Sequence, residues 1–136
     1  MKEIERNNKS FEDIKHTDEN GVEFWYAREL MPILQYSNWQ NFEKIVNKAK
    51  ISCENSNINV LDHFTDISKM VQIGSGAERK QQDYELTRYA CYLIAQNGDS
   101  RKKVIALAQT YFAVQTRKQE ITEKEYSMLT EDEKRF

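Results

Sequence analysis

The chain has 136 residues, of which 39% are hydrophobic and 31% are charged, and its formal net charge is −2. This size suits one compact domain with charged ends, and no apolar run approaches the roughly 20 residues that a transmembrane helix needs. The first residues lack the apolar stretch of a signal peptide and the two cysteines are isolated, so we expect a cytoplasmic protein with reduced thiols.

Charge is distributed unevenly along the chain. Residues 1–21 carry 4 basic and 6 acidic side chains, residues 22–118 carry 13 and 10, and residues 119–136 carry 3 and 6. A mildly basic centre between acidic ends is compatible with a nucleic-acid partner, although a solvated mixed-charge surface has the same composition. We therefore expect an N-terminal arm with a short helix (1–21), a central domain (22–118) and a charged helical extension (119–136) leading toward a missing C-terminal region.

The N-terminal part predicts short elements. A short helix fits residues 10–17, a turn fits 18–21, and the aromatic and branched residues of 22–26 favour a strand. A helix over 27–34 follows. Its Pro32 lies near the first turn, where the lost backbone hydrogen bond costs less than it does in a helix interior.

A longer amphipathic helix of about four turns begins near Trp39, because apolar residues recur there at spacings of three and four. Ser37 or Asn38 is placed to cap it. A short helix, a four-residue break and a longer helix form the outline of a helix-turn-helix. Its polar face is rich in amides and lysines, namely Gln40, Asn41, Lys44, Asn47, Lys48 and Lys50.

The apolar period shifts toward two between Leu61 and Leu86. Segments 67–73 and 79–86 flank Gly74–Gly76, which predicts a small antiparallel β-hairpin with a glycine-containing turn. Four polar residues would make this hairpin a basic flap beside the helices: Ser68, Lys69, Arg79 and Lys80.

A helical hairpin is expected next. A helix over 87–97 ends at Asn97-Gly98, and Asp99 or Ser100 is placed to cap a second helix. Three cations would open that helix, against its dipole, which suggests an anionic partner: Arg101, Lys102 and Lys103.

The fold class that follows is α+β and mostly helical. The helical spacing predicts a core made of Trp39, Phe42, Ile45, Leu93, Ile94, Ala108 and Phe112. Three other aromatic residues lie off the apolar stripes and are candidates for exposure, where they could stack on unpaired bases: Trp25, Tyr36 and Tyr92.

Residues with catalytic chemistry are sparse. Asp62, His63 and Asp66 could be drawn as a metal or acid–base cluster, but a turn with a partly buried histidine explains them with fewer assumptions. The glycines of 74–76 lack the spacing of a phosphate-binding loop. We therefore expect a non-enzymatic protein without cofactor or metal, and a metal-dependent nuclease is the weakest alternative.

Several segments closely resemble the bacterial DNA-damage-inducible protein D family. They are Phe24-Trp-Tyr-Ala-Arg-Glu-Leu-Met-Pro-Ile-Leu-Gln-Tyr-Ser-Asn-Trp39, Asp62-His-Phe64, Gly74-Ser-Gly-Ala77 and Leu86-Thr-Arg-Tyr-Ala-Cys-Tyr-Leu-Ile-Ala-Gln-Asn-Gly-Asp-Ser-Arg-Lys102. The N-terminal half of that family is similar to the Bro-N domain of phage antirepressors and baculovirus repeated-ORF proteins. Two positions depart from the pattern: Gln35 stands where a glycine is expected and Lys103 where a proline is expected.

The resemblance implies a DNA-binding module expressed in the DNA-damage (SOS) response and acting near recombination or repair. Seven cations would contact phosphate: Lys44, Lys48, Arg79, Lys80, Arg101, Lys102 and Lys103. Three amides could reach base edges, namely Gln40, Asn41 and Asn47. The alternative is a protein-interaction module that modulates a recombinase filament or a repressor. Strand preference, target sequence and oligomeric state stay open.

Overall fold

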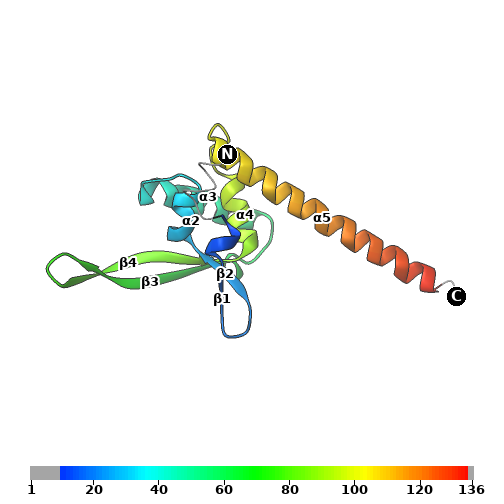
Figure 1. The fold of residues 1–136 in the computed structure, drawn as a ribbon, viewed down its shortest axis with the longest axis horizontal. Coiled ribbons are helices and arrows are strands. Elements are labelled where there is room, and N and C mark those ends of the chain that lie inside the picture. The colour runs from blue at the N-terminus through cyan, green and yellow to red at the C-terminus, as the bar shows by residue number, and fades with distance from the viewer. Residues whose placement is uncertain (1–9, 135–136) are drawn as a thin grey trace.

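The computed structural model describes residues 10–134, with side chains as far as Lys118. A four-stranded antiparallel sheet runs in the order β1-β2-β4-β3, and helices pack over one side of it (Figure 1). The strands are β1 (His16–Thr17), β2 (Glu23–Tyr26), β3 (Phe64–Ile73) and β4 (Ala77–Leu86).

Helices make up the rest of the fold, and together with the sheet they confirm the predicted α+β class. The α-helices are α2 (Ala27–Ile33), α3 (Trp39–Asn55), α4 (Arg88–Gln96) and α5 (Lys103–Lys134), and two 3₁₀ turns are η1 (Glu12–Ile14) and η2 (Val60–Asp62). The first turns of α5 pack on the body through Ile105 and Phe112, and the rest of the helix projects away from it (Figure 1).

The hydrophobic core lies between the sheet and the helices. Phe42, Leu93, Ile94 and Phe112 are buried there as predicted. Trp39, Ile45 and Ala108 are only partly buried and pack against the edge of this core. Burying a large apolar side chain contributes roughly 1.5–3 kcal/mol, so these contacts dominate the stability of the domain.

The expected exposure of Trp25 is wrong, because its indole is fully buried. Trp25 pairs with Leu86 across β2 and β4, and the two-residue period of the strand turns its side chain toward the helices. Phe11 stacks on the indole with ring centroids 4.4 Å apart, and its carbonyl accepts the indole N–H at 2.9 Å. Tyr36 and Tyr92 are partly buried.

Arg88 ties the N-terminal segment to the sheet and to α4. Its guanidinium donates to both carboxylate oxygens of Glu23 and to both of Glu12, at 2.8–3.0 Å. These hydrogen bonds raise the pKa of Arg88 and lower that of Glu12. The Tyr111 hydroxyl of α5 also donates to Glu12, at 2.6 Å, so this one carboxylate joins three elements.

This network predicts an acid-dependent loss of stability. The pKa of Glu12 is lower in the folded protein than in the unfolded chain. The ionised carboxylate of Glu12 therefore stabilises the fold in full above the unfolded-state pKa, and this stabilisation is lost as the pH falls through the folded-state pKa. The free energy of unfolding, measured by urea titration from about pH 6 to about pH 3, should therefore fall less steeply in Glu12→Gln than in the wild type. Glu19→Gln, in the exposed β1–β2 loop, serves as the control and should keep the wild-type slope.

The connection between α2 and α3 contains a residue in an unfavourable backbone conformation. Gln35 has φ 61°, and the amides of Gln35 and Tyr36 return to the carbonyls of Pro32 and Met31, which is the hydrogen-bond pattern of a glycine-type helix end. The sequence pattern leads us to expect glycine at this position, and glycine adopts this backbone conformation without steric cost. Asn38 then caps α3 by accepting the Asn41 amide at 3.0 Å.

Gln35→Gly should stabilise the protein. Glycine removes the steric cost of the left-handed conformation, and after its larger entropy loss the gain should be about 0.5–1 kcal/mol. Chemical denaturation measures this difference directly. Gln35→Ala keeps a Cβ and should give no gain. Equal stability of the glycine and alanine variants would contradict the conformational explanation.

Candidate nucleic-acid interface

The outward face of α3 gathers the polar residues that the sequence predicts to read DNA. The helical period directs Phe42, Val46, Ala49 and Cys53 into the core. The opposite side is exposed along its whole length and carries Gln40, Asn41, Lys44, Asn47 and Lys48. The structure therefore brings these five residues together on one solvent-facing surface, which we call the α3 face.

Two further predicted residues lie on a long β-ribbon formed by β3 and β4. The strands pair over ten residues, from Phe64 opposite Leu86 to Ile73 opposite Ala77. The ribbon extends well beyond the helices (Figure 1), and Arg79 and Lys80 are exposed on its outer half. It is longer than the sequence predicts, because the strands begin at the core residue Phe64 rather than at 67.

A buried carboxylate fastens this ribbon to α2. Asp83 is 2% exposed, and its Oδ1 accepts the amide of Arg28 at 3.0 Å and that of Tyr84 at 2.8 Å. Arg28 is the second residue of α2, whose own N-cap residue, Tyr26, makes no side-chain cap. Asp83, on strand β4, therefore caps the N-terminus of α2, and its negative charge also complements the dipole of that helix. The Nζ of Lys69 lies 3.6 Å from Oδ2.

The next residue of β4 fastens the ribbon to α3. The Tyr84 hydroxyl donates to Glu43 at 3.1 Å, and the Nζ of Lys50 lies 4.3 Å from the centre of its ring. Burial, together with this carboxylate, raises the pKa of Tyr84. Arg28 completes the junction: its Nε donates to the Gln82 carbonyl at 2.6 Å, and its guanidinium lies 4.0 Å from the Trp39 ring centre.

The last three predicted cations lie at the start of α5, where the structure corrects one expectation. The helix begins at Lys103, so Arg101 and Lys102 precede it and only Lys103 occupies its first turn. Asp99 does not cap α5. Its carboxylate instead accepts the Arg101 backbone amide and guanidinium at 2.9–3.0 Å, which lowers the pKa of Asp99.

Lys102 is engaged within the fold. Its Nζ donates to the Gln35 carbonyl at 3.3 Å and lies 3.8 Å from the centre of the Tyr36 ring. The turn before α5 is thereby joined to the turn between α2 and α3. The electrostatic cost of three cations near a helix start is therefore smaller than the sequence suggests. Asp99 pairs with Arg101, and the Gln35 carbonyl accepts a hydrogen bond from Lys102.

The fold does not bring the two cation groups into one clamp. Arg79 and Lys80 lie on the ribbon, whereas Arg101–Lys103 lie at the start of α5. The helical body separates the start of α5 from the ribbon (Figure 1). Phosphate contacts from both groups would therefore be made at separate places on a nucleic acid.

The residues of the nuclease alternative are engaged separately. The Nδ1 of His63 lies 2.6 Å from the Thr87 hydroxyl, whereas Asp66 lies 3.8 Å from the Nζ of Lys50. Within the part of the chain that the structure describes, no three His, Cys, Asp or Glu side chains are grouped to hold a metal ion. In the same part, none of the helices has the length and hydropathy to cross a membrane.

A comparison with protein families identifies the family of this chain. The N-terminal domain of the BRO family (Bro-N) matches residues 13–113, which is most of the chain. The chain belongs to the BRO family. The match begins within η1 and ends in α5, so it contains the sheet, the α3 face and the ribbon.

A curated relative extends the comparison. The chain is 51% identical over 127 residues to the DNA damage-inducible protein D of Escherichia coli (strain K12), and this match covers 93% of the chain. The chain spans 46% of the length of that relative. No solved structure matches the chain.

The residues that hold the interface together escaped the sequence analysis. Asp83 and Tyr84 stand in a strand of charged and polar residues, and their burial depends on which part of the ribbon lies beneath α2 and α3. A signal was present in Tyr84-Glu-Leu86, where apolar residues alternate toward the core end. Nothing in the sequence distinguishes a buried Asp83 from an exposed carboxylate.

We predict that Asp83→Ala destabilises the domain by about 1–3 kcal/mol, because it leaves the Arg28 amide at the start of α2 without its acceptor. Asp66→Ala is the matched control: it also removes a carboxylate beside a lysine, but Asp66 is 69% exposed and should cost less than about 1 kcal/mol. Urea denaturation gives both values. An Asp83→Ala variant no less stable than Asp66→Ala would rule out the capping role.

Proposed function

We propose that this chain is a non-catalytic DNA-binding module of a DNA-damage response protein. The observation that carries the proposal is the α3 face, on which five exposed amide and lysine side chains project from one amphipathic helix. A short helix and a tight turn precede it, which is the local order of a helix-turn-helix. The family match and the name of the relative, DNA damage-inducible protein D, agree with this assignment.

The two kinds of side chain on the α3 face have different roles in the proposal. Lysines contact phosphate and set affinity, while amides form paired hydrogen bonds to base edges and set sequence preference. Lys44 and Lys48 are the phosphate contacts of the helix, and Gln40, Asn41 and Asn47 are its base contacts. Five further cations are proposed to contact phosphate outside α3: Arg79, Lys80, Arg101, Lys102 and Lys103.

A protein-interaction module is the second candidate, and one observation favours it. An open groove of about 720 Å³ lies between α4 and α5 and is lined by Tyr89, Tyr92, Tyr111 and Phe112. Tyrosine is enriched at protein interfaces because one ring combines apolar area with a hydroxyl. A recombinase or a repressor is the kind of partner that this candidate implies.

Salt dependence separates the two candidates. Lys44→Ala/Lys48→Ala should weaken binding to duplexes of unrelated sequence by similar factors, because both lysines contact phosphate. It should also flatten the slope of log affinity against log salt by up to about 1.8, or about 0.9 for each contact. Fluorescence anisotropy at several salt concentrations measures both effects, and alanine at these exposed helical positions favours the fold.

The matched control is Lys15→Ala, which removes an exposed lysine from the N-terminal segment and should leave the slope unchanged. A wild-type protein that binds neither duplex nor single-stranded DNA at low salt would contradict the proposal. Capture of a purified recombinase or repressor with little salt sensitivity would then support the second candidate.

A further inference from the structure

The outer half of the β3–β4 ribbon has an unusual composition for an exposed hairpin. Its turn and the first residue after it are small and uncharged: Gly74, Ser75, Gly76 and Ala77. Gly74 and Gly76 have positive φ, and a Cβ at either position would meet no atom within 4 Å, so the chain there is slender and free of neighbours. The end of the ribbon is thus barely wider than its two backbones.

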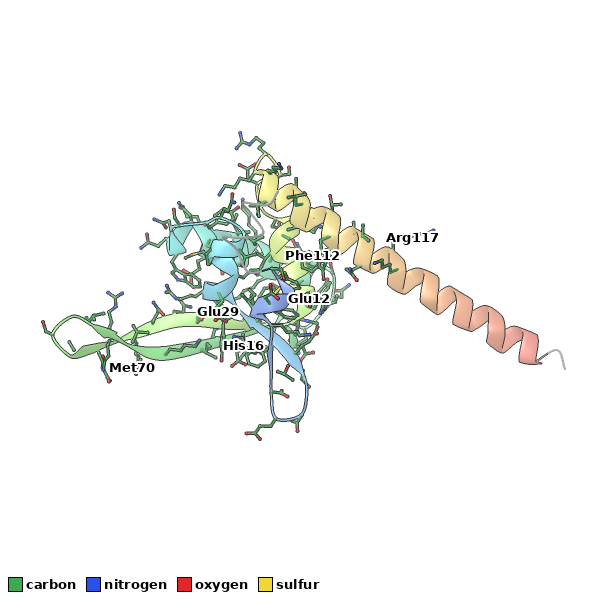
Figure 2. All side chains as sticks on the ribbon, viewed as in Figure 1. Glu12, His16, Glu29, Met70, Phe112 and Arg117 are labelled. Atoms are coloured by element: carbon green, nitrogen blue, oxygen red, sulfur yellow. The ribbon has the colours of Figure 1, made fainter. Side chains whose placement is uncertain are left out.

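Large apolar side chains stand exposed just behind this slender end. Ile73 is 43% exposed and Met70 is 57% exposed. Figure 2 shows Met70 on the ribbon, well outside the helical body. Exposed aliphatic side chains near the end of a two-stranded ribbon gain nothing for the folded monomer, because no core lies within their reach.

Cations stand on the strand opposite these apolar residues. Arg79 pairs with Val71 and Lys80 pairs with Met70. Glu78 is the one acidic residue in the sequence from Ile67 to Gln82, which also contains Lys69. The loop between β1 and β2 has the opposite sign, with Asp18 and Glu19, and it points in another direction (Figure 1). A polyanion is therefore drawn to the ribbon and away from that loop.

We propose that the β3–β4 ribbon is an arm that enters the minor groove of duplex DNA and bends it. This inference rests on the proposed DNA-binding function and adds a second reading element to the α3 face. Met70 and Lys80 share one face of the ribbon, whereas Ile73 and Arg79 lie on the other. Ile73, nearer the turn, presses against a base step as an apolar wedge and Met70 packs against the wall of the groove, while Arg79 and Lys80 contact the phosphates that border it.

The dimensions and chemistry of the ribbon favour this groove. The minor groove is about 6 Å wide, so the slender turn of small residues is the part of the ribbon that fits it; a two-stranded ribbon also fits the wider major groove, and the apolar side chains decide between the two. Apolar wedges of the Ile and Met type partly unstack base steps there and bend the duplex by about 20–90°. The junction at Asp83 and Tyr84 holds the base of the arm against α2 and α3, so the position of the arm is set before DNA binds.

The decisive experiment measures DNA bending rather than affinity alone. End-labelled duplex DNA is followed by fluorescence resonance energy transfer with the wild type and with Met70→Ser/Ile73→Ser. The wild type should bend the duplex, and the double variant should lose most of the bend while keeping the contacts of the α3 face. Val22→Ser/Leu61→Ser is the matched control, because it replaces two aliphatic residues of comparable exposure (56% and 76%) outside the ribbon.

The outcomes separate this inference from the proposed function. Wild-type protein that binds and bends DNA, with a bend lost only in the ribbon variant, supports the arm. Wild-type protein that binds DNA without bending it, or an unchanged bend in the ribbon variant, overturns the arm and leaves the α3 face standing. Absence of any DNA binding by the wild type overturns both.

A second measurement locates the groove without removing any contact. Ser75→Cys carries an iron chelate at the end of the ribbon, while the natural cysteines, Cys53 and Cys91, are buried. Cleavage of the two DNA strands offset in the 3′ direction, and suppressed by a minor-groove ligand such as distamycin, supports the proposal. Cleavage offset in the 5′ direction places the end of the ribbon in the major groove and contradicts it.

Discussion

The arrangement of this domain depends on the capping of α2 by a buried carboxylate from another element. Asp83 lies on β4, yet its acceptor oxygen serves the second amide of α2, to which the local sequence offers no side-chain cap. A buried carboxylate is tolerated only when hydrogen bonds compensate for lost hydration, and two amides and Lys69 provide that here. The geometry of these bonds determines where the ribbon crosses the helices.

This constraint joins two surfaces that would otherwise be independent. Tyr84 follows Asp83 directly and reaches Glu43 on α3, so one dipeptide of β4 contacts both helices of the proposed DNA-reading pair. The α3 face and the ribbon therefore share one base. In the proposed complex, a duplex bound to the amides and lysines of α3 would meet the ribbon in a set orientation, and little conformational entropy would be lost on binding. Arg88 plays the corresponding part at the start of α4, where it holds the N-terminal segment through Glu12 and strand β2 through Glu23.

Local patterns predicted the elements, and long-range contacts decided the site. The three-and-four spacing after Trp39 identified α3 and its exposed face, and Gly74–Gly76 identified the turn of the ribbon. Trp25 was misassigned because a strand residue has no helical stripe, and its burial follows from the Phe11 ring that covers it. Arg101 and Lys102 appeared to open α5, but their pairing with Asp99 and Gln35 depends on turn geometry and on contact with the turn between α2 and α3. Family resemblance anticipated glycine at residue 35, which the left-handed backbone there explains.

If the β3–β4 ribbon and α3 form one rigid surface, the distance between them has one value, and a distance distribution measures it. Spin labels at Glu54→Cys on α3 and Gln72→Cys on the ribbon report that distance by double electron–electron resonance, and both positions are exposed whereas Cys53 and Cys91 are buried. We expect one narrow distribution that stays in place when DNA is added and broadens when Asp83 is changed to alanine. A broad distribution in the otherwise unaltered protein, or one indifferent to Asp83→Ala, would contradict it.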